Sequence, residues 1–127
     1  MTQTTGAAGV FAYDSWVAVI DAERGELATD AAKLLSSACR GSESSLGRLM
    51  NLYANYLKLL MSSQLDGRLR ARISPSDVVQ ETFFEAHRDF HQFRGRTTGE
   101  FIAWLRRILI NNLLRVVEQH LVAEKRD

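Results

Sequence analysis

Two histidines, His87 and His91, stand four residues apart, a spacing that places both side chains on one face of a helix. Imidazole pairs at this spacing can bind zinc. The chain has no HExxH pattern and no obvious third ligand, and its single cysteine, Cys39, offers neither a disulfide within the chain nor the paired thiolates of structural zinc. We therefore expect no metal, no cofactor and no catalytic residues, with His87 at the edge of the core and His91 in a loop.

Charged side chains are the second group that could do chemistry, because they are divided into blocks that the net charge of +1 hides. Residues 67–73 and 94–115 are basic, and residues 76–89 between them are acidic. The basic side chains are Arg68, Arg70, Arg72, Arg94, Arg96, Arg106, Arg107 and Arg115, and the acidic ones are Asp77, Glu81, Glu85 and Asp89. Composition alone does not separate binding surfaces from ordinary solvated faces.

Length and hydropathy restrict the class of protein. A chain of 127 residues corresponds to about one domain with a modest core. It has no run of about 20 apolar residues, so we expect a soluble protein. Residues 1–9 lack the basic start and apolar core of a signal peptide, which predicts a cytoplasmic location.

Helical periodicity organises the first half of the chain. Asp30 is the expected N-cap of a short helix that Gly41 ends. Residues 42–45 open a longer helix that reaches the neighbourhood of Gly67. Its main apolar stripe is Leu46, Leu49, Met50, Tyr53, Leu57 and Leu60, and its second apolar line is Leu52, Tyr56 and Leu59. Two apolar lines predict a helix that is packed on two sides, although the second line could instead serve a partner helix.

Capping signals mark two further helices. Ser74 as N-cap, Pro75 at the first helical position and Asp77 as the capping-box acid predict a helix that starts there. Its expected buried stripe is Val79, Phe83, Ala86, His87 and Phe90. Thr97 and Glu100 repeat the capping-box arrangement before the longest helix, which continues to about Glu124. The expected stripe of that helix is Phe101, Trp104, Leu105, Ile108, Leu109, Asn112, Val116 and Val117.

The predicted fold is all-α, a compact bundle of about four helices, because no segment alternates apolar and polar residues over the length of a strand. We expect residues 30–127 to form this bundle. Residues 1–29 are expected to be an N-terminal extension, either regulatory or partly disordered.

Three motifs carry a family resemblance. They are Asp77-Val78-Val79-Gln80-Glu81-Thr82-Phe83, then Phe93-Arg94-Gly95, then Trp104-Leu105-Arg106-Arg107-Ile108 with Asn111. Over roughly residues 30–124 the chain resembles region 2 of an extracytoplasmic-function (ECF) sigma factor, a branch of the sigma-70 family. The resemblance implies a non-catalytic domain that binds core RNA polymerase and recognises and melts the minus-ten promoter element.

The resemblance also implies two sets of binding residues. The residues expected to contact the clamp coiled coil of the polymerase largest subunit are Asp77, Gln80, Glu81 and Glu85. The residues expected to contact promoter DNA are Phe93, Arg94, Arg96, Arg106, Arg107, Asn111 and Arg115. Two roles stay open, since Asp77 could only cap its helix and Phe93 could be a core plug under the loop. Trp104 is expected in the core rather than on DNA.

The chain departs from the family pattern in two ways. The spacing between Phe93 and Trp104 is longer than in compact members, which assigns residues 97–100 to a loop. The family's C-terminal domain, which reads the minus-thirty-five element, has no counterpart before Asp127.

Two alternatives compete with the sigma-factor interpretation. The first is a helical protein-interaction domain that engages only an anti-sigma factor or polymerase and does not bind DNA. The second is a small enzyme with a histidine-based site, which bound metal would support. We expect a monomer in the free state, with an anti-sigma factor as a further partner and no membrane contact.

Overall fold

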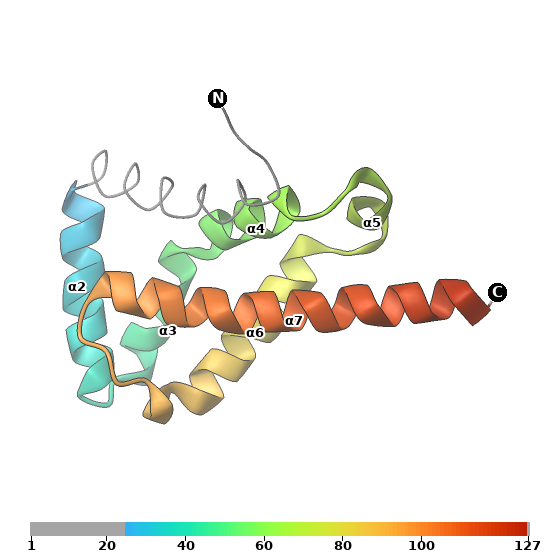
Figure 1. Ribbon diagram of the computed structural model, residues 1–127. Coiled ribbons are helices and arrows are strands. Elements are labelled where there is room, and N and C mark those ends of the chain that lie inside the picture. The colour runs from blue at the N-terminus through green and yellow to red at the C-terminus, as the bar shows by residue number, and fades with distance from the viewer. Residues whose placement is uncertain (1–24, 127) are drawn as a thin grey trace.

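The computed structural model describes residues 25–126, and this part of the chain is entirely helical, as predicted (Figure 1). The elements are α2 (Gly25–Cys39), α3 (Glu43–Leu52), α4 (Ala54–Ser63), α5 (Gly67–Arg72), α6 (Pro75–Asp89), the 3-10 helix η1 (Phe90–Gln92) and α7 (Thr98–Arg126). The prediction of about four helices was too low, because the described residues form six α-helices.

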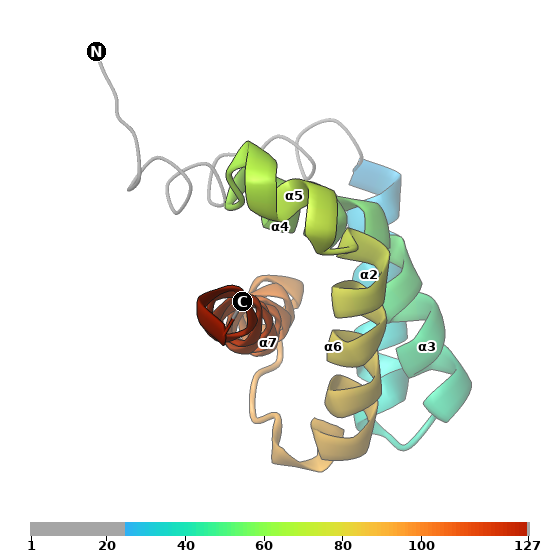
Figure 2. The same cartoon turned by 90° about the vertical axis from the view of Figure 1, so that its right-hand side faces the viewer.

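The long helix α7 is the axis of the arrangement, and α6 packs beside it. Viewed along α7, α6 separates it from α3, while α4 and α5 lie over the gap between α6 and α7 (Figure 2). Helix α2 packs on α3 and reaches the start of α7. The core therefore collects side chains from all five long helices, with Leu35, Leu49, Leu57, Val79 and Phe101 almost fully buried.

Helix α2 begins earlier than the sequence predicted. Asp30 lies inside the helix, which starts at Gly25, so its assignment as N-cap was wrong. The predicted end was correct: the backbone N–H of Gly41 donates to the Ala38 carbonyl at 3.0 Å, and that of Ser42 donates to Ser37 at 3.1 Å. This pair of bonds is a Schellman motif, which requires a left-handed residue, and Gly41 has φ +105°.

Gly41 and Gly47 form a matched pair for testing this turn. A Cβ at either position would meet nothing within 4 Å, but only Gly41 has a positive φ. Gly41→Ala should therefore destabilise the domain by about 1 kcal/mol. Gly47→Ala, inside α3, should stabilise it by up to about 1 kcal/mol because alanine is the better helix former. Urea unfolding followed by circular dichroism measures both, and the same sign for both would contradict the assignment.

The long helix predicted between residue 42 and Gly67 is interrupted at Tyr53, whose backbone lies outside the helical region (φ −105°, ψ 4°). Its predicted start is confirmed, because the Ser42 side chain accepts a hydrogen bond from the Ser45 N–H at 3.2 Å. The main stripe from Leu46 to Leu60 is buried on both sides of the break. In the second line Tyr56 is buried, but Leu59 is 55% exposed. One non-helical residue changes the direction of the chain without disturbing a spacing of three and four, so periodicity did not detect it.

The short helix α5 was not predicted, although its residues were identified as a basic block. The Asp66 side chain caps it by accepting the Leu69 N–H at 3.0 Å. Arg72 forms an ion pair with Glu124 near the end of α7, and Arg68 lies 3.8 Å from the same carboxylate. Glu124 thus partly neutralises this basic block.

Helices α6 and α7 bury or half-bury most of the residues predicted for their apolar stripes. Two predictions for α6 are corrected. Val79 and Ala86 are buried and Phe83 and Phe90 half-buried, but His87 is exposed and not at the edge of the core. Val78 and Thr82 are buried instead, because α7 covers a wider face of α6 than the apolar pattern indicated. None of the described helices is long and apolar enough to cross a membrane.

Candidate functional site

The outward face of α6 is the first candidate surface. The helix begins where Ser74 accepts the Asp77 N–H at 3.2 Å, which is the Ser74 half of the predicted capping box, and Pro75 occupies the first turn. Asp77, Gln80 and Glu81 are all exposed on this helix. Glu85 is half-buried, at 22% side-chain exposure, and lies 4.0 Å from Arg115 of α7. The four residues predicted to bind polymerase therefore share one helix, and three of them are open to solvent.

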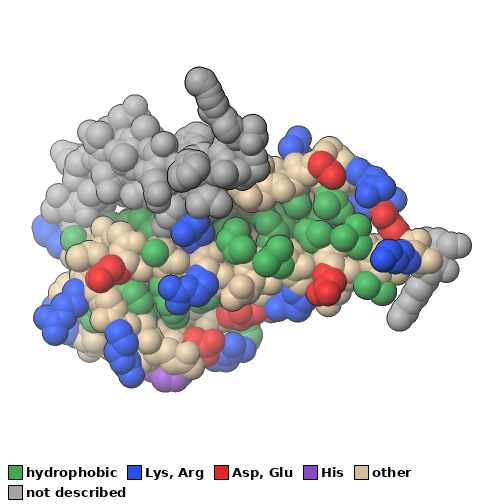
Figure 3. Space-filling view, viewed as in Figure 1, with side chains coloured by type: hydrophobic (Ala, Val, Ile, Leu, Met, Phe, Trp, Pro, Cys, Tyr) green, Lys and Arg blue, Asp and Glu red, His purple; other side chains and the backbone are tan. Residues whose placement is uncertain are grey.

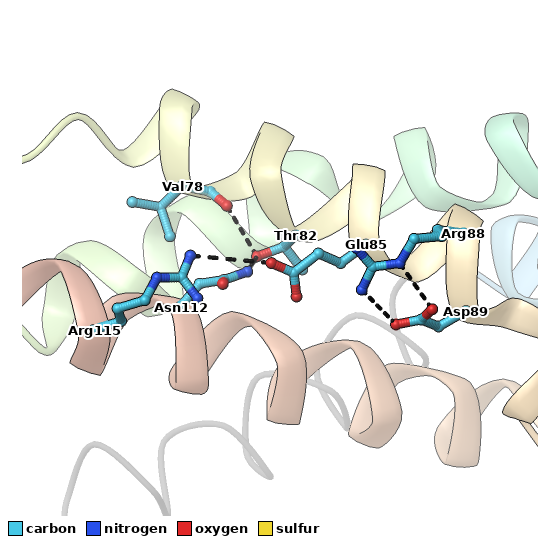
Figure 4. A network of polar contacts seen from close by, with 7 residues as sticks. All are labelled: Val78, Thr82, Glu85, Arg88, Asp89, Asn112 and Arg115. Carbon is cyan, nitrogen blue, oxygen red and sulfur yellow. Dashed lines mark hydrogen bonds and ion pairs between the residues drawn. The ribbon is translucent and has the colours of Figure 1, made fainter.

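A buried polar contact holds α6 against α7 beneath this face (Figure 4). Thr82 donates to the Val78 carbonyl at 2.9 Å and accepts from the Asn112 amide nitrogen at 3.2 Å. Both side chains are almost fully buried, at 0% and 1% exposure. The Asn112 amide oxygen is also buried and has no hydrogen-bond partner. Polar side chains in a helix interface specify a register more strictly than apolar ones, because their hydrogen bonds are directional.

The last turn of α6 carries a surface ion pair. The Arg88 guanidinium donates two hydrogen bonds to the Asp89 carboxylate, at 2.9 and 2.8 Å. These bonds hold the pKa of Asp89 below its usual value. Arg88 is therefore already partnered by an acid, and the face of α6 keeps its acidic excess.

The second candidate surface is the segment of residues 93–97 with the first turns of α7. Glu100 and Thr97 form the predicted capping box in full, since each side chain accepts the other residue's backbone N–H at 3.1 Å. Glu100 also accepts the Arg96 N–H at 2.8 Å. These backbone donors, Arg96 first, lower the pKa of the Glu100 carboxyl. Because α7 begins at Thr98, the assignment of residues 97–100 to a loop was wrong for residues 98–100.

Phe93, the first residue of this segment, packs against three other aromatic rings. Phe93 stacks on Phe90 with ring centroids 5.6 Å apart, and its ring lies 5.7 Å from Phe101 and 5.4 Å from Trp104. A Cβ on Gly95 would come within 2.6 Å of the Phe93 ring, so only glycine allows the loop to pass this closely. The Phe-Arg-Gly motif therefore has a structural basis, and Phe93 is half-buried as a plug under the loop.

An open cleft of about 350 Å³ lies between the loop and α7. Its lining is Phe93, Arg94, Gly95, Glu100, Ala103, Trp104 and Arg107. Trp104 is half-buried and exposes part of its ring here, so its assignment to the core was only partly correct. Arg94 and Arg107 are exposed at the edge, and Lys and Arg side chains are visible at both ends of the face in Figure 3. A ring beside two guanidinium groups can hold an unstacked base and its phosphates.

The comparison with protein families gives a match over much of the chain. Residues 50–121, more than half of the chain, match the family model Sigma-70 region 2. The chain belongs to the Sigma-70 region 2 family. Such domains bind core RNA polymerase and recognise and melt the minus-ten promoter element, and they are not enzymes. No curated protein and no solved structure is similar enough to the chain to give a match.

The other residues predicted for the promoter side of this sigma domain lie in different places. Asn111 is exposed one turn beyond Arg107 on the same side of α7, and Arg96 is exposed in the loop. Arg106 is half-buried and about 100° around the helix from Arg107. Arg115 lies against Glu85 of α6. Arg107, Asn111 and Arg115 therefore follow one another at a spacing of four on α7, and Arg106 lies off this line.

Three residues of the sigma domain that matter for these surfaces were not predicted. Thr82 was read only as part of a motif, and its hydrogen bond to Asn112 depends on how α6 crosses α7. Phe84 lies just outside the motifs and is 66% exposed. Gly95 was quoted without its close contact to Phe93. The described residues contain no group of three or more His, Cys, Asp or Glu side chains that could hold a metal ion.

Proposed function

We propose that this sigma domain, of the ECF type, binds the clamp coiled coil of the polymerase largest subunit through Asp77, Gln80, Glu81 and Glu85. The observation that carries the proposal is the exposed acidic face of α6 in a domain whose family binds core polymerase. Acidic residues on a solvated face set partner choice and association rate for a basic surface. Asp77 supplies charge there, since the hydrogen bond at the helix start uses its N–H and leaves its carboxylate exposed.

A double variant, Gln80→Ala with Glu81→Ala, tests this docking face. Both side chains are exposed on a helix, so the change should leave stability within about 0.5 kcal/mol of the wild type. We expect affinity for core RNA polymerase, measured by competition with a labelled domain, to fall by about tenfold. Arg48→Ala, at an exposed position on α3, is the control and should bind normally. Unchanged affinity of the folded double variant would contradict the assignment.

On the promoter side, we propose that the 350 Å³ cleft holds a base extruded from the minus-ten element. Extruding a base costs a few kcal/mol, which stacking and phosphate contacts can offset. Arg94 and Arg107 lie at the cleft and suit phosphate contacts, and Asn111 suits a base edge. Phe93 acts by supporting the loop from its aromatic cluster and by exposing part of its ring to the cleft.

Salt dependence tests the phosphate contacts. For the complex of this domain with core polymerase, we expect Arg94→Ala with Arg107→Ala to weaken binding of a randomised single-stranded oligonucleotide pool. The slope of log affinity against log salt should fall by about 0.7 for each lost contact. Arg48→Ala removes one positive charge far from the cleft along the chain and should keep the slope. An unchanged slope in the double variant would assign the phosphate contacts elsewhere.

The remaining arginines have different roles in this proposal. Arg96, exposed in the loop, contacts the backbone beside the extruded base. Arg106 and Arg115 contribute long-range charge, since Arg106 is half-buried and Arg115 pairs with Glu85. We further propose that the domain is a cytoplasmic monomer when free and that an anti-sigma factor is a second partner. We also propose that residues 1–29 are an N-terminal extension and that residues 30–127 are the sigma domain, although α2 starts before that boundary, at Gly25.

A further inference from the structure

Phe84 is the most exposed large apolar side chain among the described residues, at 66%. It follows Phe83, which is half-buried against the core, and the two consecutive aromatic residues point in directions about 100° apart around α6. A phenylalanine this exposed buries little apolar surface within the domain. Its side chain therefore contributes little to folding and is free to contact a partner.

The surroundings of Phe84 show what kind of partner would fit. Gln80 and Glu81 precede it by four and three residues, and His87 and Arg88 follow it by three and four, so these side chains surround it on the helix. All four are exposed. An aromatic side chain at the centre of a ring of polar residues has the composition of an interface hot spot, where the rim excludes water from the central contact.

The charge of α6 indicates which partners could cover Phe84 and the polar residues around it. Helix α6 carries Asp77, Glu81, Glu85 and Asp89 against Arg88 as its only lysine or arginine, and Arg88 is bonded to Asp89. An acidic partner such as nucleic acid would be repelled, whereas a basic protein surface with an apolar centre would be complementary. The same ring contains Gln80 and Glu81, so Phe84 is continuous with the polymerase-binding face.

We infer that Phe84 is the apolar anchor of this domain on core RNA polymerase and that it inserts between apolar side chains of the basic clamp surface. The inference rests on the proposed function of the α6 face. It adds that affinity depends on burying one aromatic ring, while Gln80 and Glu81 set orientation and exclude water from the contact.

Phe84→Ala and Phe84→Leu are compared with Leu114→Ala in binding to core RNA polymerase. Leu114, 60% exposed on α7, controls for the loss of an exposed apolar side chain away from α6. We expect Phe84→Ala to weaken binding by about 10- to 30-fold, Phe84→Leu to weaken it less, and Leu114→Ala to bind normally. A photoreactive phenylalanine analogue at position 84 should crosslink to the largest subunit, and one at position 114 should not. Circular dichroism checks that every variant is folded.

The binding results distinguish the Phe84 anchor from the proposed docking of α6 on which it rests. Normal binding by Phe84→Ala, with binding lost in the Gln80→Ala, Glu81→Ala variant, would overturn the anchor and leave α6 docking intact. Normal binding by both variants would overturn α6 docking and the anchor together. Weakened binding by Phe84→Ala alone would support the anchor and remove the polar residues from the contact.

Discussion

Phe101→Ala is expected to destabilise the domain by about 3–5 kcal/mol, the typical loss for a buried phenylalanine. The Phe101 ring is fully buried, and its centroid lies 6.1 Å from Phe90, 5.7 Å from Phe93 and 6.0 Å from Trp104. Small domains are stable by only about 5–15 kcal/mol, so this loss would remove a large part of the free energy of unfolding. Urea unfolding followed by circular dichroism measures it.

Phe84→Ala is the matched control, because the chemical change is the same and the ring is mostly exposed. It should change stability by no more than about 0.5 kcal/mol. Phe93→Ala should give an intermediate loss, since that ring is half-buried. If Phe101→Ala cost no more than Phe84→Ala, the aromatic cluster would not be the packed support of the loop that we describe.

Local signals allowed much of the fold to be predicted from the sequence. The Thr97 and Glu100 capping box and the Ser74 cap both depend on residues within four positions, and both start helices as expected. Periodicity failed where the outcome depends on distant contacts. The break at Tyr53 leaves the apolar spacing intact, and burial of Val78 and Thr82 depends on how much of α6 is covered by α7.

The candidate site was predictable to a similar degree. Motifs placed the acidic residues on α6 and the basic residues on α7 and in the loop before it, and Asp77, Gln80 and Glu81 are exposed as binding residues must be. A charge count could not tell the exposed arginines of α7 from the half-buried one. Arg106 and Arg107 carry the same charge and differ only in the direction in which each side chain leaves the helix axis. The charge count also gave no signal for Phe84, which lies beside a core phenylalanine and would pass for part of the same stripe.

Thr82→Val should destabilise the domain by about 1–3 kcal/mol, because it leaves the buried Asn112 amide without its hydrogen-bond acceptor. Asn112→Leu should be close to neutral or stabilising. It removes the amide oxygen that already lacks a partner, and Thr82 keeps its hydrogen bond to the Val78 carbonyl. The control is Arg115→Ala, which breaks only a partly exposed ion pair and should cost less than about 1 kcal/mol.

The double variant, Thr82→Val with Asn112→Leu, completes a cycle in which the free-energy changes of the two single variants should not add. Replacing both polar partners by apolar groups leaves no unsatisfied amide, so the double variant should be more stable than Thr82→Val alone. Additive losses would mean that the hydrogen bond between α6 and α7 does not stabilise the domain. If the cycle behaves as expected, Asn112 is not required for stability. Its hydrogen bond to Thr82 instead fixes the register between α6 and α7, the two helices that carry the proposed polymerase and promoter surfaces.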